Sequence, residues 1–101
     1  MALGLIETVG LSTAMAALDA ASKCADVRLT GMERVIGVGK QVSVTLNISG
    51  TVADVQAAVE AGVCAAERVG TVISSRVIAS PHEDVNKVIA LFEKSFPLCE
   101  E

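Results

Sequence analysis

Two stretches of alternating apolar and polar residues, separated by a glycine-spaced loop, constrain the fold of this 101-residue chain more than any other feature. In the second stretch, residues 41–49, apolar side chains occupy every second position: Val42, Val44, Leu46 and Ile48. A period of two is typical of a strand that is buried on one face only. Because the first stretch runs up to Val35, residues 36–40 are expected to form a loop between two strands.

The remaining elements follow from helical spacing, capping residues and shorter alternating runs. We expect strands at residues 3–9, 27–35 and 71–79, and helices at 11–24 and from Thr51 to the residues before Gly70. The inner face of the first helix is predicted to be Leu11, Ala14, Met15, Leu18 and Ala21. That of the second helix is predicted to be Val52, Val55, Val59, Gly62, Val63, Ala66 and Val69. Thr51-Val52-Ala53-Asp54 resembles a capping box at the start of this helix, and close packing against a neighbour would justify a glycine at 62 in its interior.

A third helix is expected after the last strand. Ser80 suits its N-cap, Pro81 its first position and Glu83 the reciprocal capping position. The domain is expected to span residues 1–101 as one unit, ordered over about 2–96 with a loose tail at 97–101.

The order strand, helix, strand, strand, helix, strand predicts an α+β fold of the ferredoxin-like βαββαβ type. Such a fold has an antiparallel sheet with the helices on one face, here followed by the C-terminal helix. Hydrophobic residues make up 51% of the chain, mostly Ala and Val, which is more apolar surface than a small domain hides alone. We therefore expect a homo-oligomer.

Charge and composition exclude several classes of protein. The net charge of −4 disfavours nucleic-acid binding, and the strands lack the aromatic residues on which RNA bases stack. No apolar run is long enough for a membrane span, and the N-terminal residues do not form a signal peptide, so a cytoplasmic location is expected. Cys24, Cys64 and Cys99 are too far apart for a zinc site and are expected to be free thiols, two of them packing as small apolar groups. An iron–sulfur cluster on an oligomer axis would need a cysteine in the loop, which has none.

The loop Ile36–Lys40 offers backbone amides, an apolar tip and one cation, but no side chain suited to covalent chemistry. It lacks the first glycine and the Ser or Thr of a phosphate-binding loop, and it precedes a strand. A binding rim or a pore fits it better than a catalytic centre. His82 is the single histidine and has no evident partner, so neither catalysis nor metal binding is expected. Glu33 and Arg34, on opposite faces of one strand, suit solvated charges or an intersubunit ion pair.

Together these segments resemble the hexameric shell proteins of bacterial microcompartments, the BMC-domain family. The matching segments lie in family order, and they are residues 2–8, 23–27, 31–33, 57–70 and 77–82. They include Ala2-Leu3-Gly4-Leu5-Ile6-Glu7 at one end and Ala79-Ser80-Pro81-His82 at the other.

The resemblance implies a structural protein without enzymatic activity or cofactor, located in the microcompartment shell in the bacterial cytoplasm. Six copies would form a flat tile, with Ile36, Gly37, Val38, Gly39 and Lys40 around a central pore that passes small polar metabolites. Lys23, Ser80, Pro81 and His82 would lie at the tile edge. Other shell proteins and encapsulated enzymes would be its partners.

Two features depart from the family pattern. Ser80 stands where members often carry an arginine, and the loop is longer and more apolar than the common Gly-Ser-Gly type. The hydrogen bonding at the tile edge and the width of the pore therefore cannot be taken from better-known members of the family. The alternative that the residues leave open is a ferredoxin-like regulatory domain that binds a small molecule as a dimer or trimer.

Overall fold

The computed structural model describes residues 1–36 and 42–79 and has the expected order of elements. These elements are β1 (Ala2–Val9), α1 (Leu11–Cys24), β2 (Arg28–Ile36), β3 (Val42–Gly50), α2 (Val52–Glu67) and β4 (Val72–Ile78). The βαββαβ prediction is thus confirmed, and α1 has the predicted bounds. The expected third helix from Ser80 and the tail at 97–101 lie outside the described residues.

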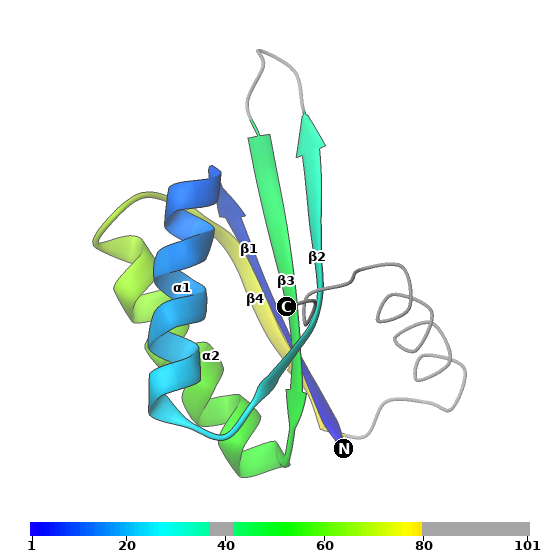
Figure 1. Ribbon diagram of the computed structural model, residues 1–101. Coiled ribbons are helices and arrows are strands. Elements are labelled where there is room, and N and C mark those ends of the chain that lie inside the picture. The colour runs from blue at the N-terminus through cyan, green and yellow to red at the C-terminus, as the bar shows by residue number, and fades with distance from the viewer. Residues whose placement is uncertain (37–41, 80–101) are drawn as a thin grey trace, which may run out of the picture.

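The four strands form one antiparallel sheet in the order β2-β3-β1-β4, and both helices lie on the same face of it (Figure 1). β1 occupies the middle, paired with β3 from Ala2↔Gly50 to Val9↔Ser43 and with β4 on its other side. The helices contact β1, β3 and β4 far more than β2. As a result, β2 is an edge strand that the described helices leave largely uncovered.

The core lies between the helices and the central strands. The alternation read from the sequence is confirmed on β3, where Val44, Leu46 and Ile48 are buried. They pack with Ile6 of β1 and with Val55 of α2. Val42, the fourth apolar residue of this set, is only partly buried because it lies beyond the end of β1.

The predicted inner faces of the two helices are partly wrong. On α1, Leu11 and Met15 are 44% and 41% exposed, and the buried residues are Thr13, Ala14, Ala17 and Ala21. Val52 at the start of α2 and Val69, two residues past its end, are exposed. The buried residues of α2 are Val55, Ala58, Val59, Gly62 and Ala66. The reason is that α1 packs mainly against α2. The two helices can approach most closely where the side chains between them are small. The small residues of α1 therefore face α2, and its larger residues Leu11 and Met15 stay exposed.

Two glycines show how closely the layers pack. A Cβ on Gly62 of α2 would lie 3.0 Å from the Ala17 carbonyl oxygen of α1, so the predicted need for close packing at this helical glycine is confirmed. A Cβ on Gly4 of β1 would lie 2.8 Å from side-chain atoms of both Val55 and Val59. The helix α2 therefore rests directly on the backbone of the central strand.

The helix α2 begins with the predicted cap. The side-chain oxygen of Thr51 accepts a hydrogen bond of 3.2 Å from the backbone N–H of Asp54. This bond satisfies one of the four N–H groups that a helix start leaves without a partner. The acidic side chain of Asp54 in the first turn also interacts favourably with the positive end of the helix dipole.

Replacing Gly4 by alanine tests this packing. Because the new methyl group would overlap two branched side chains of α2, Gly4→Ala should lower the free energy of unfolding by about 1–3 kcal/mol. Urea denaturation at one fixed protein concentration measures the change. The control is Ser75→Ala on the exposed strand β4, expected to change stability by less than about 0.5 kcal/mol. Equal stability of the two variants would contradict the close contact between α2 and β1.

Candidate pore and tile-edge sites

The β2–β3 hairpin carries the predicted pore loop at its end. The last two paired rungs are Val35↔Ser43 and Ile36↔Val42, which leaves residues 37–41 to connect the strands. β1 ends beside Ser43, and Figure 1 shows the hairpin projecting past the ends of both helices. Of the predicted pore residues, Ile36 is described, whereas Gly37, Val38, Gly39 and Lys40 lie outside the described residues.

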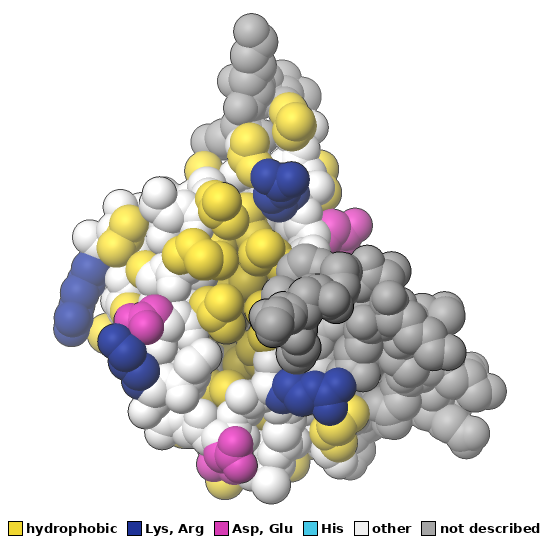
Figure 2. Space-filling view, in the orientation of Figure 1, with side chains coloured by type: hydrophobic (Ala, Val, Ile, Leu, Met, Phe, Trp, Pro, Cys, Tyr) yellow, Lys and Arg dark blue, Asp and Glu magenta, His cyan; other side chains and the backbone are white. Residues whose placement is uncertain are grey.

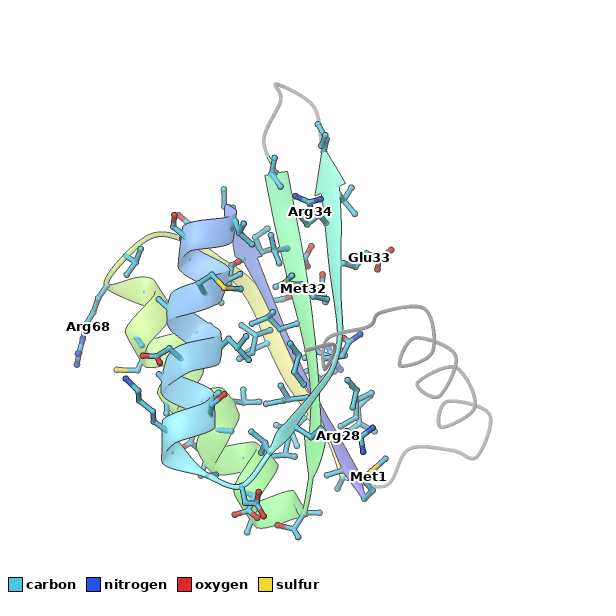
Figure 3. The ribbon with its side chains drawn as sticks, viewed as in Figure 1. Met1, Arg28, Met32, Glu33, Arg34 and Arg68 are labelled. Atoms are coloured by element: carbon cyan, nitrogen blue, oxygen red, sulfur yellow. The ribbon has the colours of Figure 1, made fainter. Side chains whose placement is uncertain are left out.

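The described part of the hairpin exposes both apolar and charged side chains. Val35 is 54% exposed and Ile36 is 75% exposed. Because strand residues alternate between faces, Arg34 and Ile36 lie on the helix-bearing side, and Glu33 and Val35 on the other. Figure 3 shows Arg34 and Glu33 pointing to these opposite sides. The predicted placement of Glu33 and Arg34 on opposite faces is therefore correct.

A hollow of about 240 Å³ lies on the helix-bearing side of the hairpin, open to solvent. The described residues that line it are Arg34, Ile36 and Val42. Figure 2 shows apolar side chains gathered between α1 and this hairpin. Sequence reasoning missed the hollow, because it depends on β2 being left uncovered by α1.

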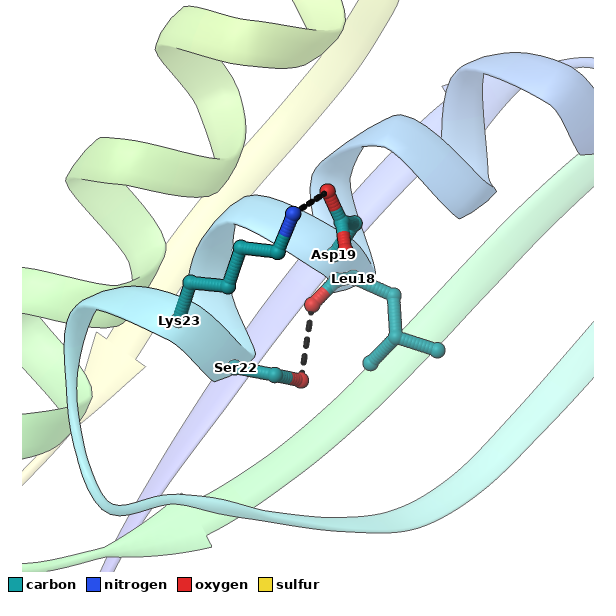
Figure 4. Close-up of polar contacts among 4 residues, drawn as sticks. All are labelled: Leu18, Asp19, Ser22 and Lys23. Carbon is teal, nitrogen blue, oxygen red and sulfur yellow. Dashed lines mark hydrogen bonds and ion pairs between the residues drawn. The ribbon is translucent and has the colours of Figure 1, made fainter.

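The predicted edge residue Lys23 lies in the last turn of α1 and is exposed. Its ammonium nitrogen is 3.0 Å from a carboxylate oxygen of Asp19, one helical turn earlier (Figure 4). With the two side chains 75% and 63% exposed, this ion pair adds little stability. The spacing of four residues between Asp19 and Lys23 could have revealed the pair.

The two candidate sites lie at opposite ends of the molecule. α1 starts near the hairpin and ends, with Lys23, at the far end (Figure 1). β4 also ends at this far end, at Ile78, just before the predicted edge residues Ser80, Pro81 and His82. Those three residues themselves lie outside the described part of the chain.

The described residues hold no cluster that suggests metal chemistry. Cys24 and Cys64 are free thiols, as expected, but both are exposed, so the expectation that two of the three cysteines pack as small apolar groups is wrong. Cys99 lies outside the described residues. Within residues 1–36 and 42–79, no three His, Cys, Asp or Glu side chains gather closely enough to hold a metal ion. The two described helices are also too short or too polar to span a membrane.

Comparison with known proteins agrees with the fold. The family model of the BMC domain matches residues 2–81. The chain is 47% identical to the bacterial microcompartment shell protein PduA of Citrobacter freundii, over 87% of this chain and 90% of that one. It is 45% identical to the carboxysome shell protein CsoS1C of Hydrogenovibrio crunogenus, over 94% of this chain and 90% of that one.

A solved structure shows the same similarity in three dimensions. A microcompartment protein from Desulfitobacterium hafniense superimposes with a TM-score of 0.71 and 36% identity, over 85% of this chain. The chain spans 47% of the length of that solved chain. This chain therefore belongs to the BMC-domain family, as the resemblance in its sequence indicated.

Proposed function

We propose that this chain is a structural shell protein that assembles into a homohexameric tile with a central pore. The observation that carries the proposal is the projecting β2–β3 hairpin, which lies at the opposite end of the molecule from Lys23. Such a subunit can direct its loop toward a ring axis and its other end toward the next tile. The similarity to named shell proteins supports the same reading.

The exposed apolar side chains support assembly. Large hydrophobic residues are exposed on several described elements: Leu11, Met15, Val35, Ile36, Val52, Val69 and Ile73. Because they lie on different sides of the molecule, a subunit can use distinct surfaces for distinct neighbours, as a closed ring requires. Within such a tile the chain acts as one domain, without catalysis or cofactor, in the shell of a compartment in the bacterial cytoplasm. Its partners are other shell proteins and the enclosed enzymes.

The pore mechanism follows from sixfold symmetry, which turns each loop residue into a ring of six. Glycines at 37 and 39 let the backbone approach the axis without Cβ crowding. If the backbone amides face the axis, they favour anions and polar metabolites. A ring of Val38 facing the axis would instead form a drier, less permissive constriction. Lys40 adds positive potential if it faces the axis. Small polar metabolites pass such a pore, while larger or volatile apolar molecules are held back.

Solution mass and imaging test the assembly itself. Light scattering on the purified protein should give the mass of six chains, and negative-stain electron microscopy of the same sample should show sheets or tubes of hexagonal tiles. A stable dimer or trimer that never tiles would contradict the proposal and favour the ligand-binding regulatory domain.

Replacing Lys23 by alanine tests the tile edge. We expect Lys23→Ala to leave hexamers intact in solution but to abolish extended sheets, because the exposed cation is lost from the edge. The matched control is Asp19→Asn, which removes the ion-pair partner within the subunit but keeps the lysine. Sheets from Lys23→Ala as extensive as those of the wild type would show that Lys23 is not an edge contact.

Changing the loop charge tests the pore. In assembled shells, Val38→Asp and Lys40→Glu should each slow the entry of a small anionic metabolite severalfold, because a ring of carboxylates repels anions. Entry is measured as turnover of that metabolite by an enclosed reporter enzyme. Glu60→Gln, an exposed charge change on α2, is the control. Unchanged entry with both loop variants would refute passage through this loop.

A further inference from the structure

The two faces of the β2–β3 hairpin carry opposite charges and apolar side chains at neighbouring positions along β2. On one face, Glu33 is followed two residues later by Val35. On the helix-bearing face, Arg34 is followed two residues later by Ile36. Each face thus presents a charge nearer the sheet and an apolar side chain nearer the loop, and the two charges have opposite signs. All four side chains are exposed.

These groups lack partners within the described part of the subunit. Neither Glu33 nor Arg34 makes an ion pair with a described residue, whereas Lys23 pairs with Asp19. Ile36, 75% exposed, borders the hollow of about 240 Å³ beside Arg34. Val35 projects from the opposite face and is 54% exposed. One hairpin therefore carries a hollow on one face and an apolar knob on the other.

Such an arrangement suits head-to-tail repetition rather than twofold pairing. A twofold contact joins one surface patch to itself, which would place like charges together. A ring joins two different patches of each copy, so every hairpin near the axis has one neighbour on each side. Opposite charges and a knob with a matching hollow are what two such patches need.

We propose that the Glu33–Val35 face of one hairpin docks on the Arg34–Ile36 face of the next copy in the ring. The Glu33 carboxylate pairs with the neighbour's Arg34 guanidinium, and Val35 enters the hollow lined by Arg34, Ile36 and Val42. This inference rests on the proposed hexamer and adds the contact that frames its pore. The pairing also neutralises Arg34, so Arg34 adds no net positive charge beside the loop.

Charge reversal tests the pairing through a mixture of two variants. Glu33→Arg places two cations at every ring contact, and Arg34→Glu places two anions there. Each variant alone should need at least about tenfold more protein than the wild type to assemble, because like charges meet at each interface. In an equimolar mixture the two variants can alternate around the ring, and every contact becomes attractive again. Native mass spectrometry of co-expressed subunits should then show hexamers with three copies of each variant.

Further measurements separate this contact from other causes. Circular dichroism should show that each variant subunit is folded. The double variant carrying both Glu33→Arg and Arg34→Glu should assemble like the wild type, because the pair is restored with its signs exchanged. High salt should partly restore assembly of each single variant, since it screens like charges. The control reversals Glu60→Arg and Arg68→Glu, on α2 and at its end, should leave assembly unchanged.

The outcomes distinguish this contact from the proposed function. If the wild type forms hexamers and either single variant does so equally well, the hairpin pairing is wrong and the shell tile stands. Single variants that fail to assemble, with no recovery in the mixture or in the double variant, also overturn the pairing. If the wild type forms no six-membered ring, the proposed function itself fails.

Discussion

The close approach of α2 to the central strand β1 is the constraint on which the rest of the structure depends. Gly4 has no side chain where Val55 and Val59 press on the strand, and Gly62 lets α2 approach the backbone of α1. Because both helices are held over the middle of the sheet, they cannot also cover β2. Small residues in the core thereby leave the β2–β3 hairpin without support from α1 or α2.

An uncovered hairpin suits a protein that works by assembly. Inside a self-sufficient domain, exposed Val35 and Ile36 would be an aggregation liability at a sheet edge. In the proposed ring, the same side chains would contact neighbouring copies, so the subunit would need no larger core of its own. The high content of Ala and Val also suits assembly. These small side chains let the helices pack close to the sheet, and they leave apolar surface for contacts with other subunits.

Some features were predictable because they are local. The alternation on β3, the Thr51 cap and the order of elements follow from strand period, capping chemistry and helical spacing within a few residues. The family segments also identified the fold. The helix faces were less predictable: Leu11 and Met15 have the right spacing for a core stripe, yet α1 turns its alanines inward. When a helix has two adjacent apolar stripes, its sequence does not show which one is buried, because that depends on the element against which the helix packs.

The sequence by itself determined the class of fold, the presence of a loop between the second and third strands and the opposite orientation of Glu33 and Arg34. The order of the elements sets the class of fold. Periodicity within one stretch of chain sets the two strands on either side of the loop and the opposite orientation of the two charged side chains. Only the tertiary structure decided that Lys23 and the hairpin lie at opposite ends and that a hollow forms beside Arg34. These features depend on how far each element extends past its neighbours and on which strand the helices leave uncovered. Packing between segments distant in sequence sets both.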